Sequence, residues 1–141
     1  MKTRIIAMII SALGFIDSVY LIVIKYSNNE KLCFIGAGDC LSINTSVYSE
    51  TFGIPNAVLG AAAYLAILGL FLIEQKSSII ARWSPYLLFG LTFLGVIYSA
   101  YLTYLEIAVI KAVCPFCVVS AVVMLALFII SITRLFESPK N

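Results

Sequence analysis

The sequence predicts an all-α integral membrane protein, a four-helix transmembrane bundle with an outer loop or lid segment between its first two helices. Of the 141 residues, 62% are hydrophobic and only 11% are charged, and the mean hydropathy is +1.08. A soluble domain carries about 25% charged residues, so this composition excludes an ordinary soluble protein. Four apolar runs are each long enough to cross the hydrocarbon core of a bilayer as a helix. The net charge of +2 is too small to predict nucleic-acid binding.

The four expected spans cover residues 5–24, 54–73, 85–105 and 114–135 of a single transmembrane domain, residues 1–141. The first run follows Lys2 and Arg4. It is too long for a signal peptide and no small-residue cleavage site follows it, so we expect it to be retained. The second span is entered through the Gly-Ile-Pro sequence at 53–55 and is rich in small residues. Because the other connections are short, residues 25–53 form the segment that can hold structure outside the membrane.

Lysine and arginine are distributed unequally between the two sides of this expected bundle. Six lie at the N-terminus, in the connection after the second span and in the tail, at Lys2, Arg4, Lys76, Arg82, Arg134 and Lys140, and the opposite side has Lys25, Lys31 and Lys111. Cytoplasmic loops are enriched in these residues, so the bias predicts a multi-pass cell-membrane protein with both termini in the cytoplasm. All four cysteines then lie on the outer face, in a compartment where disulfides form.

Four cysteines carry the conspicuous chemistry of a chain that has no histidine. Cys114 and Cys117 are spaced to share one face of a helix, and Pro115 fits the first turn of that helix. Because a helix N-terminus lowers the pKa of a thiol, we expect a redox pair, with Cys114 at the water boundary and Cys117 nearly one turn deeper. Cys33 and Cys40 flank a loop with two glycines, pliable enough to open or close a disulfide ring. A zinc site made by all four cysteines is the metal-binding alternative.

The two cysteine pairs together suggest a relay of disulfide exchange. The loop pair can react with a soluble protein, and the helix pair can exchange with the loop pair through a mixed disulfide. The chain has no G-x-G-x-x-G sequence, and Val118 follows the Cys-x-x-Cys where haem attachment needs histidine, so a lipid-soluble quinone is the simplest electron acceptor. The alternatives are a transmembrane electron conduit, which the clustering of the cysteines at one end disfavours, and a non-enzymatic tetraspan protein with permanent disulfides.

Two further patterns concern packing. Residues 14–21 and 95–102 share the pattern G-x-I-x-S-x-Y-L, and the same offset places Cys33 on Cys114. This match indicates either a parallel two-helix repeat or the ordinary recurrence of small residues and tyrosines in packed membrane helices. Outside the membrane, residues near helical spacing predict a weakly amphipathic stretch that serves as a lid or as a surface linker: Ile43, Val47, Tyr48 and Phe52.

Polar residues in and beside the spans have competing interpretations. Asp17 lies within the first span, where a carboxyl is costly. It is therefore either functional or a packing group bonded to a hydroxyl such as that of Ser18 or Tyr98. Glu106 and Lys111 are expected at the membrane interface. The tyrosines of the third span are expected to serve packing and the interface: Tyr98, Tyr101 and Tyr104.

Over nearly its whole length the chain resembles the vitamin K epoxide reductase family, in its bacterial and archaeal form. The resemblance rests on the order and spacing of a set of motifs: Cys33 and Cys40, Ser46-Val47-Tyr48, Gly53-Ile54-Pro55, Gly60 with Tyr64, and Cys114-Pro115-Phe116-Cys117. Members of this family are four- or five-helix bundles that pass electrons from thioredoxin-like proteins to a quinone and so generate disulfides. The resemblance implies a quinone (menaquinone, ubiquinone or a related one) and a thioredoxin-like (DsbA-type) partner, which we expect to be a separate protein.

The same resemblance assigns roles to individual residues. Cys117 is the thiol that meets the quinone, and Cys114 is the one that exchanges with the loop pair. Asn56 matches a family position that hydrogen-bonds a quinone carbonyl. Of the loop cysteines, Cys40 adjoins the expected lid and Cys33 follows a polar run. We therefore expect Cys40 to exchange with Cys114 and Cys33 to be met by the partner.

Overall fold

The structure is a computed structural model that describes residues 2–27, 47, 50–111 and 114–137. Four helices in these ranges are long and apolar enough to cross a membrane: α1 (Lys2–Ser27), α3 (Asn56–Glu74), α4 (Ser78–Tyr104) with its extension η3 (Leu105–Ile110), and α5 (Pro115–Glu137). They confirm the expected four-helix membrane bundle. The third helix begins at Ser78, ahead of the expected start at residue 85, because Pro85 lies inside α4 rather than at its head. Apolar membrane helices tolerate such a proline.

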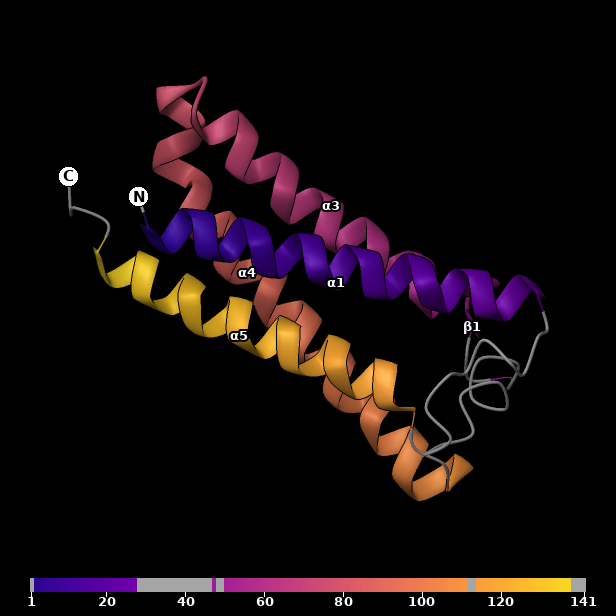
Figure 1. Cartoon of the computed structure of the whole chain (residues 1–141). Helices are drawn as coiled ribbons and strands as arrows, with labels where there is room; N and C mark the ends of the chain where they lie inside the picture. The colour runs from indigo at the N-terminus through magenta and orange to yellow at the C-terminus, as the bar shows by residue number, and fades with distance from the viewer. Residues whose placement is uncertain (1, 28–46, 48–49, 112–113, 138–141) are drawn as a thin grey trace.

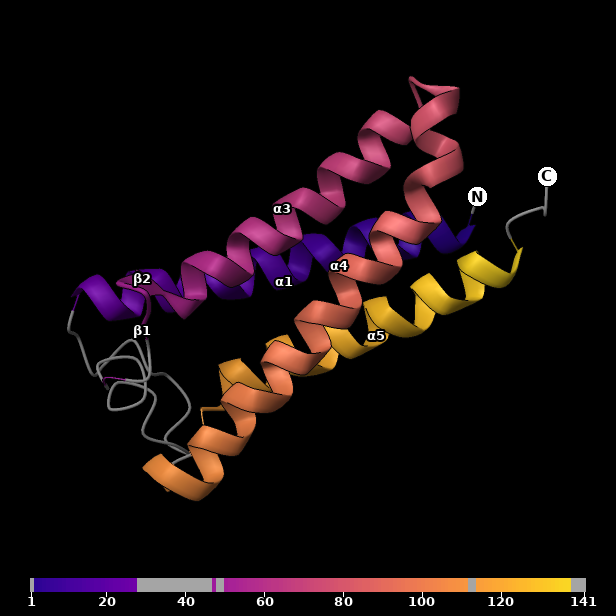
Figure 2. The same ribbon diagram turned by 180° about the vertical axis from the view of Figure 1, so that it is seen from behind.

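The helices form two neighbouring pairs, α1 with α3 and α4 with α5 (Figures 1 and 2). The pairs meet where α1 packs against α5 and α3 packs against α4. The two chain termini lie at one end of the bundle, and α3 and α5 both begin at the other end (Figure 1). The start of α5, where the Cys-x-x-Cys sequence lies, is therefore at the end opposite the termini.

Two glycines of the matching segments 14–21 and 95–102 allow these pairs to approach closely. A Cβ added to Gly14 would lie 2.5 Å from Cε1 of Tyr64, and one added to Gly95 would lie 2.7 Å from Sδ of Met124. Gly14 thus packs α1 on α3, and Gly95 packs α4 on α5. Small residues at such crossings are typical of membrane helices. The equivalent positions in the two segments therefore have equivalent packing roles, which favours the two-helix repeat.

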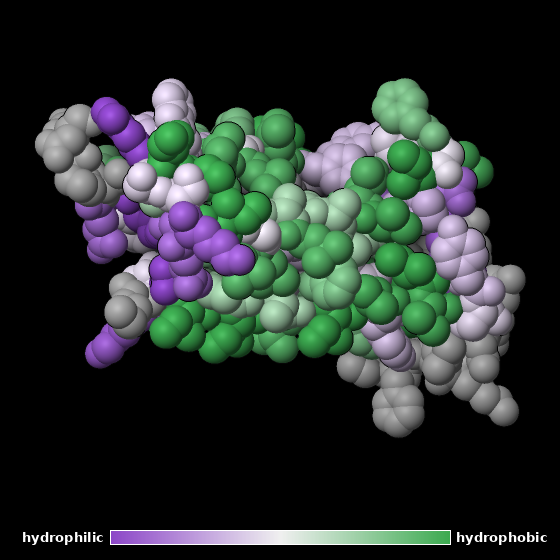
Figure 3. Space-filling view, turned by 90° about the horizontal axis from the view of Figure 1, so that it is seen from above, coloured by the Kyte–Doolittle hydropathy of each residue, from purple (hydrophilic) through white to green (hydrophobic). Residues whose placement is uncertain are grey.

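The outer surface of the bundle is apolar. Leucine, isoleucine, valine and aromatic side chains on all four helices are exposed by more than a third of their surface, among them Ile9, Leu65, Leu94 and Val122. On the face seen in Figure 3, hydrophobic side chains form a broad band, and the hydrophilic residues gather toward the ends. A continuous apolar band of this size suits lipid and not water.

An ion pair joins three helices at the end where the termini lie. Nη2 of Arg134 on α5 is 2.6 Å from Oε1 of Glu74 on α3, and Oγ of Ser84 on α4 donates to Oε2 of Glu74 at 3.0 Å. The Arg134 guanidinium also lies over the ring of Phe71, 5.0 Å from its centroid. Both partners are mostly shielded from solvent. Removing one of them would therefore leave an uncompensated charge in an apolar setting.

A short hairpin precedes α3. Strands β1 (Glu50–Thr51) and β2 (Ile54–Pro55) pair antiparallel, and Phe52 and Gly53 form the two-residue turn with φ values of 55° and 78°. Positive φ at both positions is the signature of the turn that matches strand twist. Phe52, expected near helical spacing in a lid or a surface linker, lies in this hairpin turn and not in a helix, and its side chain is 99% exposed. An ion pair of 2.9 Å between Lys25 and Glu50 ties the hairpin to the end of α1.

Candidate functional site

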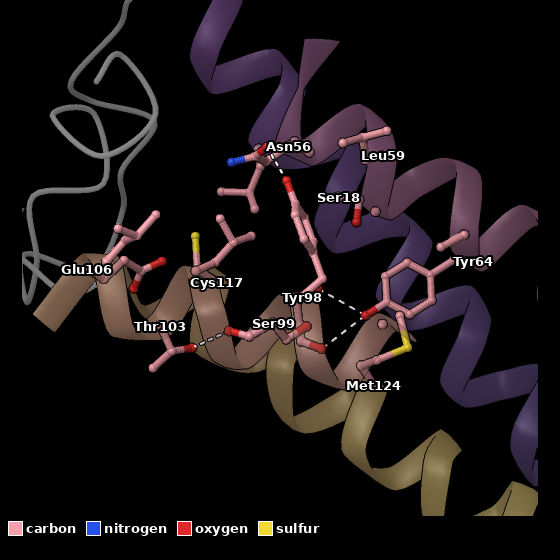
Figure 4. A pocket seen from close by; sticks show the side chains of 18 of the residues that line it. Ser18, Asn56, Leu59, Tyr64, Tyr98, Ser99, Thr103, Glu106, Cys117 and Met124 are labelled. Carbon is pink, nitrogen blue, oxygen red and sulfur yellow. Dashed lines mark hydrogen bonds between the residues drawn. The ribbon is translucent and has the colours of Figure 1, made fainter. Parts of the chain in front are cut away.

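A cavity of about 150 Å³ lies inside the bundle, toward the end where α5 begins. Every helix contributes to its wall: Ser18 comes from α1, Asn56 from α3, Tyr98 from α4, Glu106 from η3 and Cys117 from α5. Figure 4 shows these side chains around a common space. The rest of the wall is largely apolar, with leucines, alanines and glycines between the polar groups. The matching segments contribute equivalent positions, Ser18 with Ser99 and Leu21 with Leu102.

The Cys-x-x-Cys sequence is placed by the start of α5. The carbonyl oxygen of Cys114 accepts the N–H of Val118 at 3.1 Å, so Cys114 immediately precedes the helix and Pro115 is its first residue. Cys114 and Cys117 are free thiols and are hydrogen-bonded to each other. The hydrogen bond from the Cys117 thiol lowers the pKa of Cys114, and burial opposes this only in part. Cys114 is therefore the more readily ionised of the two thiols.

The side chain of Cys114 has no exposed surface. It packs with Leu21 and Ile24 of α1, and Ile110 lies against the same cluster. The sequence places Cys114 at the water boundary of its span, but the end of α1 covers it. Any thiol that reacts with Cys114 would therefore have to displace this packing. Cys117, in contrast, is half-buried and lines the cavity.

Asn56 is the first residue of α3, and its side-chain oxygen forms a triangle of contacts with two hydroxyl oxygens. Its Oδ1 accepts hydrogen bonds from Oη of Tyr98 at 2.6 Å and from Oγ1 of Thr51 at 2.9 Å, and the two hydroxyl oxygens are 2.7 Å apart. Only two hydroxyl hydrogens serve these three contacts. The carbonyl oxygen of Asn56 is thus engaged by two hydroxyl donors, which fix the orientation of the side chain at the cavity wall.

Tyr98 and Thr51 were not predicted as site residues. Tyr98 was expected to serve packing, but its phenol lines the cavity and fixes Asn56. Its neighbours Tyr101 and Tyr104 are exposed on the outer surface. Thr51 reaches Asn56 because the hairpin turns β1 back toward the start of α3. A repeated tyrosine in an apolar span does not reveal which copy faces inward.

Tyr64 forms another part of the cavity wall. It is fully buried, and its Oη donates to the carbonyl oxygen of Ser120 at 3.0 Å and lies 2.9 Å from Oγ of Ser120. These contacts join α3 to α5 beside Gly14 (Figure 4 shows Tyr64 above Met124). The ring is thus held from both sides, which gives the cavity a rigid wall.

Glu106 is expected near the membrane interface, and the structure shows that its side chain points inward: it is buried, with 4% of its surface exposed, and it lines the cavity. The cause is the π-helical turn of η3, whose wider turn changes the direction of its side chains relative to α4. Oε2 of Glu106 accepts the backbone N–H of Cys114 at 3.5 Å, and the carboxyl is also hydrogen-bonded to the Cys117 thiol. The helix ends at Lys111, which is exposed and has a φ of 57°.

Asp17 lies outside the cavity wall. Its Oδ2 is buried and has no hydrogen-bond partner among the described residues. The loop cysteines Cys33 and Cys40, and with them the expected lid around Tyr48, lie outside the described residues. The zinc alternative depends on those two cysteines, and within the described ranges no group of three or more His, Cys, Asp or Glu side chains is placed to hold a metal ion.

Comparison with known proteins gives two findings. The sequence model of the vitamin K epoxide reductase family matches residues 5–132. The thiol-disulfide oxidoreductase LTO1 of Arabidopsis thaliana is 30% identical over 122 residues, which are 83% of this chain and 32% of that protein. The chain thus spans about a third of the length of this relative. The matched region includes both cysteine pairs, Asn56 and the whole cavity wall.

Proposed function

Because the chain belongs to the vitamin K epoxide reductase family, we propose that it is a membrane thiol oxidoreductase that generates disulfides and passes the electrons to a quinone. The observation that carries this proposal is the position of Cys117. Its thiol is hydrogen-bonded to Cys114 on one side and lines a cavity within the membrane-spanning bundle on the other. A dithiol in that position can be oxidised by a molecule that binds in the cavity.

The cavity suits the head group of a quinone. Its volume is about 150 Å³, and a cavity of about that size lined by apolar side chains accepts a six-membered ring. Leu59, Ala63 and Leu102 supply apolar wall for the ring, and Asn56, on the same wall, is the polar residue that we propose hydrogen-bonds a quinone carbonyl. When bound, a quinone supplies a sink for two electrons and two protons. This polar residue and the apolar wall therefore fit the group that the family implies.

The proposed relay transfers a disulfide outward in two exchanges. A loop thiolate attacks Cys114 in the Cys114–Cys117 disulfide, forming a mixed disulfide and releasing the thiol of Cys117. The second loop thiolate then attacks the loop sulfur of the mixed disulfide and releases Cys114, which leaves the loop pair oxidised and the core pair reduced. We propose Cys40 as the loop cysteine that reaches Cys114, and Cys33 as the one that exchanges with a thioredoxin-like partner.

The proposed orientation puts both termini in the cytoplasm and the cysteine pairs outside. It is supported by the lysine and arginine bias and by the shared end at which the two termini lie (Figure 1). An impermeant maleimide added to intact, reduced cells should then label Cys33 and Cys40. Labelling that requires permeabilised cells would mean that the protein is inverted.

Trapping of free thiols tests the activity. The purified protein in lipid nanodiscs is reduced, mixed with a menaquinone or ubiquinone analogue, and quenched with a maleimide that adds mass to each free thiol. We expect the quinone to convert the core pair from two labelled thiols to none, and Cys114→Ser and Cys117→Ser each to abolish quinone-dependent oxidation of a dithiol protein. Cysteines that remain unlabelled after reductant would indicate permanent disulfides. Near-normal turnover in either variant would contradict the relay.

A further inference from the structure

Glu106 is a carboxyl group buried inside a membrane bundle, and its position calls for an explanation. It has 4% of its surface exposed. The ion pairs among the described residues, Lys25 with Glu50 and Arg134 with Glu74, do not include it. Burying an unpaired carboxylate is costly, and such residues in membrane segments usually have a function. Its π-helical setting is also one that recurs at functional sites.

The contacts of Glu106 are with the reacting cysteines. Oε2 accepts the N–H of Cys114 at 3.5 Å, and the carboxyl is hydrogen-bonded to the Cys117 thiol. Figure 4 shows its carboxyl beside the Cys117 side chain, at the same end of the cavity. The single hydrogen of the Cys117 thiol thus has two acceptors within reach, the sulfur of Cys114 and the carboxyl of Glu106.

Oxidation of the core pair requires a proton acceptor at this place. Two thiols that form a disulfide release two electrons and two protons, and the proton of Cys117 starts inside the bundle. The chain has no histidine. The other titratable side chains that face Cys117 or the cavity are Cys114 ahead of α5 and two phenols, Tyr64 on α3 and Tyr98 on α4. Helix α1 contributes Ser18 and Leu21, which do not titrate. Glu106 is therefore the one carboxyl on the described wall.

We propose that Glu106 is a catalytic proton acceptor, which takes the thiol proton of Cys117 as the Cys114–Cys117 disulfide forms and releases it into the cavity. This inference rests on the proposed function. The electron pair leaves with the formation of the sulfur–sulfur bond. The two protons, one from Cys114 and one that passes through Glu106, equal the two that a quinone takes up with that electron pair. Glu106 ends the step as the carboxylate that began it.

A purely structural role is the competing explanation, because Glu106 also satisfies the N–H of Cys114 and so closes the turn between η3 and α5. Glu106→Gln separates the two roles. An amide oxygen still accepts that N–H and has nearly the same shape, but it does not take up a proton near neutral pH. If Glu106 acts as a proton acceptor, this variant loses that function. If Glu106 only closes the turn, the variant keeps the hydrogen bond from the Cys114 N–H and behaves normally.

The test uses the full chain without a quinone. In a background of Cys33→Ser, Cys40→Ser and Cys114→Ser, the remaining Cys117 is reacted with a lipid-soluble maleimide over a range of pH, and the rate is followed by mass spectrometry. Transfer of the thiol proton to Glu106 leaves the number of bound protons unchanged, so the rate should level off over the pH range between the pKa of the carboxyl and that of the thiol. In Glu106→Gln only free thiolate reacts, so the rate should fall about tenfold for each unit of pH. Near neutral pH the difference should be at least about tenfold.

Glu74→Gln is the matched control, since it removes a shielded carboxyl at the opposite end of the bundle. In this variant the alkylation rate of Cys117 should still level off with pH, even if the substitution lowers the stability of the protein. In Glu106→Ala, added formate should restore part of the lost rate. If Glu106→Gln does not fold, Glu106→Asp keeps a carboxyl and should keep the levelled profile. A levelled profile in folded Glu106→Gln, or its absence in folded Glu106→Asp, would overturn the proposal. Since no quinone or loop cysteine is involved, either outcome is independent of the proposed function.

Discussion

Oη of Tyr98 on α4 donates a hydrogen bond of 2.6 Å to Oδ1 of Asn56, the first residue of α3. The two residues are 42 positions apart in the chain, so their contact depends on the packing of α3 against α4. It engages the carbonyl oxygen of the amide, so the packing of α3 against α4 orients the Asn56 side chain.

Replacing Asn56 by alanine should weaken the use of quinone with little effect on folding. A hydrogen bond that is left unmade at a buried site costs about 1–3 kcal/mol, which corresponds to a loss of roughly 5–150-fold in kcat/KM for the quinone. Steady-state kinetics with a water-soluble quinone analogue, together with a thermal unfolding curve, would measure both effects. Unchanged quinone kinetics would mean that Asn56 has no part in quinone binding and serves only to begin α3 after Pro55.

Tyr98→Phe should produce a smaller loss of the same kind. The ring stays in place, and Thr51 still donates to Asn56, so the amide is less firmly oriented but not freed. We expect about a fivefold loss in kcat/KM for the quinone, equivalent to about 1 kcal/mol for one hydrogen bond. Tyr101→Phe, on the exposed face of the same helix, is the control and should change nothing. If kcat/KM for the quinone were normal in Tyr98→Phe but reduced in Asn56→Ala, the hydroxyl of Tyr98 would have no part in quinone use and the residue would serve only packing.

The helices could be predicted from the sequence because lipid imposes one simple requirement, an uninterrupted apolar run of sufficient length. The cysteine spacing likewise places Cys114 directly before α5 and Cys117 in its first turn. The inward position of Glu106 could not be predicted, because it depends on a π-helical turn that breaks the regular helical period. A charged residue near the end of a span normally indicates the interface.

The Asn56 site was predicted only in part for a related reason. Its partners come from a different helix and from a two-residue strand, and no local pattern connects them. Phe52 illustrates the same limit, since its spacing matched a helical face while the following glycine allowed a tight hairpin turn. Contacts between distant segments depend on how the helices pack, and the pattern of hydropathy along the chain does not predict that packing.

The two glycines of the matching segments should differ in their tolerance of alanine. Gly14→Ala would place Cβ against the ring of Tyr64, which is fully buried and hydrogen-bonded to Ser120, so the ring has no room to move. We expect a loss of about 1–3 kcal/mol in the free energy of unfolding. Gly95→Ala meets only the flexible end of Met124 and should cost less. Unfolding in mixed micelles would measure both.

Gly90→Ala serves as the control for that comparison. Nothing lies within 4 Å of a Cβ at Gly90, so alanine there should be neutral or stabilise α4 by up to about 1 kcal/mol through helix propensity. Equal losses at Gly14 and Gly90 would show that close helix contact is not what requires glycine at position 14.

The pH dependence of Cys114 should change when its partner thiol is removed. The hydrogen bond from Cys117 lowers the pKa of Cys114, so in the reduced protein its thiolate forms at a lower pH than that of an ordinary cysteine. Cys117→Ala removes this donor, and the pKa should rise. The rate of Cys114 alkylation, measured by peptide mass spectrometry with Cys33 and Cys40 replaced by serine, should therefore require a higher pH. An unchanged midpoint would mean that another group stabilises the Cys114 thiolate.

Trapping in Cys117→Ser should identify the loop cysteine that reaches the core. Without Cys117, a loop thiol that pairs with Cys114 is no longer displaced from the core side, so the mixed disulfide should accumulate above its level in the intact protein, and further when the other loop thiol, which can also resolve it, is replaced. The hairpin anchors the chain that follows Cys40, through the Lys25–Glu50 ion pair and the contacts of Thr51. We therefore expect Cys40–Cys114 to be the dominant link.

The repeat register argues for the other pairing, because the offset that aligns Gly14 with Gly95 also aligns Cys33 with Cys114. Non-reducing digestion and mass spectrometry of the linked peptides would distinguish the two. Cys33→Ser added to Cys117→Ser should leave the link intact, and Cys40→Ser added instead should abolish it. A dominant Cys33–Cys114 link would exchange the roles of the two loop cysteines and would still leave Cys114 as the point of entry to the core pair, because both outcomes attach the loop to the same sulfur.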